Sequence, residues 1–494
     1  MADVLSMPAS GELFHTAIGA AFADLFLDGH RQTWAIRSKR FRAWLKRHYY
    51  RETGTALSAA AMRSTLDLLE ARAQFDGPEG SVHVRVAEHA GRIYLDLADE
   101  CWRAVEISPD GWRVIGAPPV RFLRAPGMLP LPVPRPDGSI ETLLPLLNIA
   151  THDDLVLILT WLLATLRPRG PYPVLALSGE QGSAKTVLSK LLKALIDPNV
   201  APVRSLVREE RDLMIAANHG HLLAFDNLSD LPVSLSDAFC RLATGASFAR
   251  RQLYTDDDEV LFQAARPILL NSIEDVIRRP DLADRAIFLM LAPIGERRRR
   301  SEEKLWREFE IARPYILGAL LNAAAHGLRE LSRVRLERLP RLADFALWAT
   351  ACEGAFWPAG TFLRAYDANR RAAIESVLDK DPVAACVREI MADRSTWTGT
   401  ASDLLRVAAN RGGGYGASWD SEAWPRNPRA LAGRLRRAQT FLRALGIDIT
   451  FSREGRAGSR IIRMRATLEN TVCTVRSVSD DGAGGRTTYA ATGR

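Results

Sequence analysis

Cysteine, lysine and long apolar runs are scarce in this sequence. The five cysteines lie far apart, with no C-x-x-C pair and no histidine at metal-ligand spacing. This argues against a disulfide scaffold or a zinc site and indicates a reducing, cytoplasmic compartment. The longest apolar stretch, residues 155–166, is shorter than the roughly 20 residues that span a bilayer. It predicts a buried helix and no membrane partner, and the N-terminus lacks the pattern of a secretory signal.

The composition is that of a soluble globular protein of about three folding units. Of its 494 residues, 47% are hydrophobic and 25% charged. Lys and Arg number 66 against 58 Asp and Glu, and only seven of the 66 are Lys. Residues 401–494 hold 16 basic and 8 acidic residues, whereas the preceding 400 residues balance. The net charge of +8 therefore lies in the C-terminal region.

The patterning along the chain predicts an α/β protein with several modules. Residues 34–75 read as helical with a basic start, which we interpret as a solvated helix face rather than a nucleic-acid contact. From residue 82 the apolar period changes to two, which predicts an antiparallel meander. The expected units are an N-terminal α+β module (1–117), a proline-rich extended linker (118–150), a parallel α/β core (151–300), a helical region (301–380), a C-terminal module (381–466) and a disordered tail (467–494).

The strongest local signal is an apolar strand, residues 173–178, followed by the segment GEQGSAKT and an amphipathic helix. This is the context of a phosphate-binding loop, in which Lys185 reaches the β- and γ-phosphates of ATP and Thr186 holds Mg²⁺. The usual glycine before the lysine is replaced by Ala184. The expected nucleotide-binding residues are Gly179, Gly182, Ser183, Ala184, Lys185 and Thr186.

Polar residues at the ends of later apolar strands complete the expected site. Asp226 follows the run HLLAF and is the candidate Mg²⁺ carboxylate. Asn227 stands where a second acid is usual, so the general base is unassigned. Asn271 ends the strand PILLN, where a γ-phosphate sensor would lie.

Two arginines, Arg279 and Arg285, precede the next apolar strand. Either is a candidate finger acting on the ATP of a neighbouring subunit, with Arg285 preferred. The alternative for each is a structural salt bridge to Asp281 or Asp284.

The order of these blocks over residues 173–291 resembles that of the superfamily 3 branch of AAA+ ATPases. That group contains hexameric replicative helicases of phages, plasmids and small viruses. More closely, the chain resembles the primase-helicase-type ATP-binding proteins of prophages and integrative elements. The resemblance rests on GEQGSAKT as Walker A, HLLAFDN as Walker B, PILLN as motif C, RPDLADRA as the finger region and residues 242–255 as the B′ motif.

In that family the segment after B′ is a hairpin that grips single-stranded DNA in the central pore. Here residues 256–259 are all acidic, the wrong sign for a phosphate contact. We expect Arg250 and Arg251, at the base of the hairpin, to serve instead.

The C-terminal module contains a helix that Asn427 and Pro428 open and Gly446 closes. Its leucines recur at helical spacing, which places Arg429, Arg436, Arg437 and Arg443 on the opposite face. A hairpin with Arg456 and Arg460 follows, and the whole resembles a winged helix-turn-helix that binds DNA. The alternative is a solvated arginine face.

Together these features predict an ATP-hydrolysing, Mg²⁺-dependent DNA translocase or helicase of mobile-element replication that acts as a homohexameric ring. One rival is an ATP-switched DNA-binding regulator or helicase loader, which Asn227 and the acidic hairpin favour. A second is a DNA-binding protein with a degenerate nucleotide site. The N-terminal module lacks a D-x-D strand motif, so priming would need a separate primase.

Overall fold

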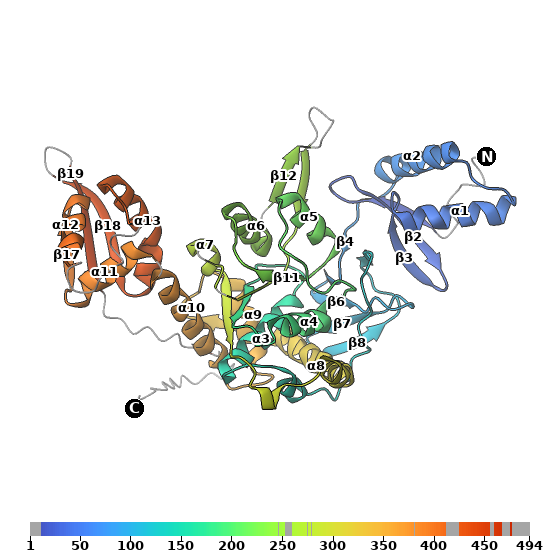
Figure 1. Cartoon of the computed structure of the whole chain (residues 1–494). Coiled ribbons are helices and arrows are strands. Elements are labelled where there is room, and N and C mark those ends of the chain that lie inside the picture. Colours follow the sequence, from blue (N-terminus) through green and yellow to red (C-terminus); the bar gives the residue numbers. More distant parts are fainter. Residues whose placement is uncertain are drawn as a thin grey trace, which may run out of the picture.

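The computed structural model describes most of the chain as three successive bodies (Figure 1). The described residues are 11–245, 247–251, 259–273, 275–277, 279–379, 381–411, 424–454, 459–466 and 475–476. In Figure 1 the N-terminal elements and the C-terminal elements lie at opposite ends of a central α/β body. None of the described helices is long and apolar enough to cross a membrane.

The N-terminal body begins with strands that the sequence analysis did not predict. Strands β1 (Glu12–His15), β2 (Ala21–Leu27) and β3 (His30–Ala35) form an antiparallel sheet. Two helices follow, α1 (Lys39–Thr53) and α2 (Ala59–Phe75), with Ser38 and Ser58 as N-caps. The expected helical region at 34–75 is therefore two helices, because Gly54 takes a left-handed conformation that ends the first.

The expected antiparallel meander is confirmed. Strands β5 (Val86–His89), β6 (Arg92–Asp96), β7 (Ala104–Ser108) and β8 (Gly111–Ile115) pair in sequence order. Strands β4 (Val82–His83) and β9 (Arg121–Phe122) form a short parallel pair. Along the chain, β4 precedes the meander and β9 follows it. One face of the meander is buried in the same hydrophobic core as the central sheet. The meander thus packs on the central body.

The expectation that residues 118–150 form an extended linker is wrong, because this segment packs against the core. It contains β9 and a 3-10 helix, η1 (Ile140–Leu146). Leu131, Leu143 and Leu146 are buried in the core that the meander and the central sheet share. Proline excludes long helices and central strands but does not stop neighbouring leucines from packing. The segment is therefore a packed strap.

The central body is the parallel α/β fold expected from the sequence. Strands β10 (Val174–Gly179), β11 (Leu223–Leu228), β14 (Ile268–Ser272) and β15 (Ala286–Leu291) form one parallel sheet in the order β11-β14-β10-β15. The associated helices are α3 (His152–Thr165), α4 (Lys185–Ile196), α5 (Glu210–His219), α6 (Val233–Thr244) and α7 (Pro280–Ala283). Helix α3 is buried along its length from Leu155, as its apolar run predicts. A hairpin of β12 (Ser247–Arg251) and β13 (Glu259–Gln263) projects from this body (Figure 1).

Helices dominate residues 301–380, as expected, and lead to a separate C-terminal core. After the short 3-10 turn η2 (Glu296–Arg298) come α8 (Glu302–Glu330), α9 (Ala343–Glu353) and α10 (Thr361–Asp379). The C-terminal body contains α11 (Pro382–Ala392), β17 (Thr396–Gly399), α12 (Ala401–Arg411), α13 (Pro428–Ala444), β18 (Ile447–Glu454) and β19 (Ser459–Ala466). These elements enclose their own hydrophobic core.

The tail contains one described pair of residues. Val475–Arg476 forms β20, which pairs antiparallel with β16 (Arg335–Leu336) on the helical region. The expectation of a wholly disordered tail is wrong at this point, because two residues pair across more than a hundred positions of sequence. The remainder of the expected tail lies outside the described residues.

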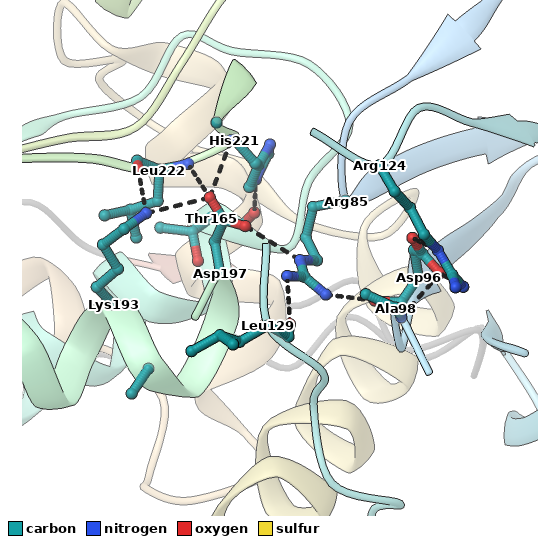
Figure 2. A network of polar contacts seen from close by, with 12 residues as sticks. Arg85, Asp96, Ala98, Arg124, Leu129, Thr165, Lys193, Asp197, His221 and Leu222 are labelled. Carbon is teal, nitrogen blue, oxygen red and sulfur yellow. Dashed lines mark hydrogen bonds and ion pairs between the residues drawn. The ribbon is translucent and has the colours of Figure 1, made fainter. Parts of the chain in front are cut away.

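A buried polar network joins the meander, the strap and the central sheet (Figure 2). Arg85, completely buried, donates to Asp197 Oδ1 at 3.1 Å and to the carbonyl oxygens of Asp96 and Leu129 at 2.9 Å each. Asp197 caps the end of α4 and accepts through Oδ2 from Lys193 Nζ and from the backbone N–H groups of residues 221 and 222. The network therefore fixes the helix that follows the β10–α4 loop against the strand that carries Asp226.

The charges of this network follow from its burial. Burial alone would raise the pKa of Asp197, but Lys193 and Arg85 outweigh it and hold that pKa well below the usual range. Burial lowers the pKa of His221 to about 4, so the ring is neutral at physiological pH. Its Nε2 donates to the Thr165 carbonyl oxygen at 2.6 Å, which ties α3 to the same point.

We expect Arg85→Met to lower the free energy of unfolding by about 3 to 5 kcal/mol, because it leaves a buried carboxylate without one of its two cations. Urea-induced unfolding followed by circular dichroism measures this change. The matched control is Arg37→Met, whose guanidinium pairs with Asp67 and Glu70 at the surface. That variant should lose no more than about 1 kcal/mol. Equal losses would show that Arg85 is not a structural node.

Candidate functional site

The β10–α4 loop, residues 180–184, joins the end of a central strand to the start of α4. Two glycines shape it through positive φ angles, +147° at Gly179 and +83° at Gly182. A Cβ on Gly179 would lie 2.4 Å from the carbonyl oxygen of Leu291. Larger residues are therefore excluded at Gly179 by both conformation and space.

Ala184 occupies a left-handed conformation, with φ +61° and ψ +27°. This explains why glycine is usual at this position of such loops: the backbone enters the helix through a region that L-residues avoid. The cost of alanine at this position therefore lies in the backbone conformation.

The first turn of α4 faces this loop without a side-chain cap. Its first N–H groups have no partner within the helix, and the positive end of the helix dipole lies there. Lys185 lies across the loop, where Nζ donates to the carbonyl oxygens of Gly179 and Glu180 at 2.7 and 2.8 Å. Burial lowers the pKa of this ammonium group, while Asp226 acts in the opposite direction.

Three polar side chains from different elements meet beside the loop. Thr186 Oγ1 donates to Asp226 Oδ1 at 3.0 Å, and Asn271 Nδ2 donates to the same oxygen at 2.5 Å. The sheet order causes this meeting, because β14 lies between β10 and β11 and all three strands end at the same edge. The structure thus brings together Lys185, Thr186, Asp226 and Asn271, four of the residues singled out in the sequence.

Asn227 lies at the exposed margin of this cluster. Its φ is +56°, at an irregularity in β11 where the register shifts, and its side chain is exposed. Asparagine tolerates the left-handed region better than most residues do. The left-handed backbone at this position gives a physical reason for asparagine where an acid is usual.

These residues line a cavity of about 590 Å³ at the carboxyl edge of the sheet. Among its lining residues as the structure describes them, Asp226 is the one carboxylate. The full lining is Gln181, Gly182, Ser183, Ala184, Lys185, Thr186, Val187, Asp226, Asn227, Asn271, Ser272 and Ile273.

Two residues near this cavity were missed by the sequence analysis. Asn148 Nδ2 donates to the carbonyl oxygens of Ser183 and Ala292, at 3.0 and 2.7 Å, and so holds the loop to the strand edge. Arg299 approaches from the other side: a Cβ on Gly182 would lie 3.8 Å from its guanidinium. No local pattern marks Asn148, whereas the run of four arginines at 297–300 is visible in the sequence.

The two finger candidates lie at the opposite edge of the sheet. Arg285 immediately precedes β15, and the register pairs Ala286 with Val174 and Leu291 with Gly179. The six residues of β15, or about 20 Å, separate it from the loop of its own chain. Arg279 pairs with Asp237 of α6 at 3.1 Å and with Asp281 at 3.7 Å, and the second pair is the salt bridge that was its alternative.

Arg285 makes no ion pair with any residue that the structure describes. It donates to the carbonyl oxygen of Asp281 at 2.5 Å, and its Nε is buried without a partner in the described structure. Asp284 pairs instead with Arg341 and Arg370. The salt-bridge alternative thus fits Arg279 better than Arg285.

The hairpin residues differ from the expectation in their position. Arg250 and Arg251 lie at the far end of β12, paired with Val260 and Glu259, and not at its base. The strand begins at Ser247, close to the body, so five residues are already used before the turn. The side chains of Arg250 and Arg251, and residues 256–258, lie outside the described structure.

The expected C-terminal helix is confirmed in its bounds. Asn427 caps it by accepting from the Ala430 N–H at 2.8 Å, Pro428 is its first residue, and Gly446 follows its end with φ +82°. On its apolar side Leu431, Leu435, Ala438 and Leu442 are buried, whereas Leu445 is only half-buried. Phe441 is buried as well.

Arginines of this helix and of the β18–β19 hairpin surround a groove of about 690 Å³. Arg429, Arg436, Arg453 and Arg460 line it. Arg436 lies over the ring of Phe451 at 4.8 Å, while Arg443 pairs with Asp448 at 2.8 Å outside the groove. Arg437 is exposed but does not line the groove, and Arg456 lies outside the described residues.

Comparison with protein families identifies the chain. Residues 140–380 match the family described as actinomycete integrative conjugative element replication protein, and residues 383–477 match the AICE RepA C-terminal domain. The two descriptions cover consecutive parts of one kind of protein, together 336 of the 494 residues. The chain belongs to this family of replication proteins. The first match ends within two residues of the boundary at which the C-terminal body begins.

Solved structures of the NrS-1 C-terminal region also resemble this replication protein. The A form apo structure of the NrS-1 C-terminal region has 12% identity to this chain and a TM-score of 0.41, over 92% of this chain and 97% of that one. Two structures of its residues 305–718 have 10% and 12% identity and TM-scores of 0.36 and 0.37, each over 93% of this chain and 96% of the other. Scores below 0.5 carry no argument for fold or function. No curated protein matches significantly.

We expect Ala184→Gly to leave the free energy of unfolding unchanged or to raise it by up to about 1 kcal/mol. Glycine relieves a left-handed alanine, which costs about 1 to 2 kcal/mol, but adds freedom to the unfolded chain. The control is Ala194→Gly in the interior of the same helix, which should cost about 1 kcal/mol. Urea unfolding compares the two, and equal destabilisation would contradict the left-handed assignment.

Proposed function

We propose that this replication protein is a Mg²⁺-dependent ATPase that assembles as a ring and uses hydrolysis to move along or unwind DNA. The observation that carries the proposal is the meeting of Thr186, Asp226 and Asn271 beside Lys185 and the uncapped start of α4. A parallel sheet collects ligand-binding groups at its carboxyl edge in this way.

The loop suits a triphosphate. Free N–H groups and the dipole at the start of α4 favour phosphate oxygens, and Lys185 supplies a positive charge at the same place. The Thr186 hydroxyl and the Asp226 carboxylate are hard oxygen ligands 3.0 Å apart, suited to Mg²⁺ that is completed by phosphate oxygens and water. When bound, Mg²⁺ would neutralise charge that develops on the phosphates. Asn271 would orient the carboxylate through its amide.

Arginines supply the remaining positive charge in this proposal. Arg299, next to Gly182, acts on the nucleotide of its own chain. Arg285 lies too far from its own loop and acts on a neighbour, which requires a ring of subunits, proposed as a hexamer. A finger in trans makes hydrolysis depend on assembly.

The C-terminal body supports DNA binding. Its element order, α11-β17-α12-α13-β18-β19, with the sheet β17-β19-β18, supports the proposal of a winged helix. Helix α13 would lie in a groove of duplex DNA, with Arg429 and Arg436 on its exposed face and Arg453 and Arg460 from the hairpin beside them. Separate priming activity is assigned to a partner protein.

A second candidate is an ATP-switched regulator or helicase loader that does not unwind DNA. The cavity's single described carboxylate favours it, since Asp226 is already engaged with Thr186 and the described lining residues include no second acid to activate water. The two candidates differ in their hydrolysis rate and its response to DNA.

We expect the full chain to hydrolyse MgATP, faster with single-stranded DNA present, and Lys185→Ala to reduce kcat/KM at least about 100-fold. Phosphate release with and without an oligonucleotide measures both. Hydrolysis that DNA does not stimulate would reject the translocase in favour of the switch. Absence of hydrolysis with retained ATP binding would reject the ATPase.

The same assay separates the two arginines. Arg285→Ala should lower the rate of ATP hydrolysis about 1000-fold. Arg279→Ala, which loses a surface pair with Asp237, should change that rate less than tenfold. Mixing Lys185→Ala with Arg285→Ala subunits should restore part of the activity, since some interfaces then contain both intact groups. A mixture without activity would contradict a finger in trans.

We expect Arg429→Gln/Arg436→Gln to weaken duplex binding about tenfold and to lower the slope of log affinity against log salt by about two, because two phosphate contacts are lost. Fluorescence anisotropy at several salt concentrations measures this. Arg443→Gln is the control on the same helix, since Asp448 already holds that guanidinium. Equal effects from both variants would contradict the groove as the binding surface.

A further inference from the structure

Helix α1 in the N-terminal body exposes five cationic side chains on one side, which we call the α1 basic face. At about 100° per residue its members span one side of the helix, opposite the buried side chains of Phe41, Leu45 and Tyr49. All five members are exposed: Lys39, Arg42, Lys46, Arg47 and Arg51. The one acid of the helix, Glu52, lies toward the other side. The balanced charge of residues 1–150 conceals this concentration.

Ion pairs do not neutralise this face. Within the described residues, none of the five lies within 4.0 Å of a carboxylate, although ion pairs are frequent elsewhere in this arginine-rich chain. The contrast is sharp at Arg37, which stands just before the helix and pairs with Asp67 and Glu70 of α2. The carboxylates of α2 are thus close to α1 yet leave its basic face open.

The arrangement is unfavourable for the helix by itself. Arg42 with Lys46, and Arg47 with Arg51, are like-charged pairs four residues apart, which repel. The first turn contains no acid and three exposed cations, Lys39, Arg40 and Arg42, where the helix dipole favours negative charge. A polyanion on this face would remove both costs.

Aromatic contacts hold α1 in a fixed position. Arg40 lies over the ring of Trp34 at 4.7 Å and over that of Trp102 at 5.9 Å. Arg124 also lies over the ring of Trp102, 3.9 Å from its centroid. These residues join the helix to β3, to the β6–β7 connection and to the strap. Figure 1 shows α1 at the end of the molecule away from the C-terminal body.

We propose that the α1 basic face binds the phosphate backbone of duplex DNA, as a second DNA contact separate from the C-terminal groove. A rigid row of cations along a helix of 15 residues, about 22 Å, suits the stiff and dense charge array of a duplex. Single-stranded DNA is bound by aromatic platforms as well as charge, and this face offers Tyr50 alone. Contacts made by Lys and Arg to phosphates carry no base specificity.

The test compares two double variants of the full chain that each remove two exposed positive charges. Arg42→Gln/Lys46→Gln alters the α1 basic face, and Arg63→Gln/Arg72→Gln alters α2 as the matched control. Both pairs are introduced into the wild type and into Arg429→Gln/Arg436→Gln, so that residual binding does not come from α13. Anisotropy is measured with a random-sequence duplex and with an oligothymidine strand between about 50 and 200 mM salt.

We expect the α1 variant to bind duplex about tenfold more weakly and with a salt slope lower by about two, in both backgrounds. The α2 control should change less than twofold, and Arg42→Lys/Arg47→Lys should bind as the wild type does. The melting temperature of the α1 variant should be unchanged or higher, because repulsion within the helix is relieved. Equal losses from α1 and α2 variants, an unchanged slope, or a loss confined to the single strand would overturn the proposal. If Arg429→Gln/Arg436→Gln binds DNA as the wild type does, the C-terminal contact is rejected. The comparison of the α1 and α2 variants still tests the α1 basic face in that case.

Discussion

The ion pair between Arg85 and Asp197 is the contact on which the arrangement of the central body depends. Asp197 receives the end of α4, the start of β11 and the guanidinium of the meander at once, while Arg85 also satisfies carbonyl groups of the meander and of the strap. Buried charges require such full satisfaction. Because α4 begins at the loop and β11 carries Asp226, this node sets the distance across which Thr186 and Asp226 meet.

The candidate site shows how backbone conformation and chemistry are combined in a few residues. Ala184 and Asn227 both adopt left-handed conformations, and both flank groups that would contact a nucleotide. Strain of this kind is found where a loop must point its donors toward a ligand. Asn148 reinforces the loop from a segment that its prolines would suggest to be a spacer, so the strap contributes to the site as well as to the core.

Charge in this protein is distributed by body and not by average. In the central body, Arg299 beside the loop and Arg285 at the far end of the sheet make no ion pair with the described residues. The C-terminal excess is partly internal, since Asp448 and Glu454 engage Arg443 and Arg463. The N-terminal body, neutral in sum, concentrates its cations on one helix and its acids elsewhere.

Local sequence determined the elements whose cause is local. The β10–α4 loop, the meander, the buried helix α3 and the capped helix α13 follow from periodicity, turn residues and caps, and the blocks ending in Asp226 and Asn271 were found by strand length and position. The strands β1–β3, the packing of the strap and the role of Asn148 were not, because they rest on contacts between residues distant in sequence. Tertiary structure also showed that Arg279 is paired with Asp237 and that Arg250 and Arg251 lie at the end of their described strand, since the partner and the edge on which a side chain lies are set by strand order and register.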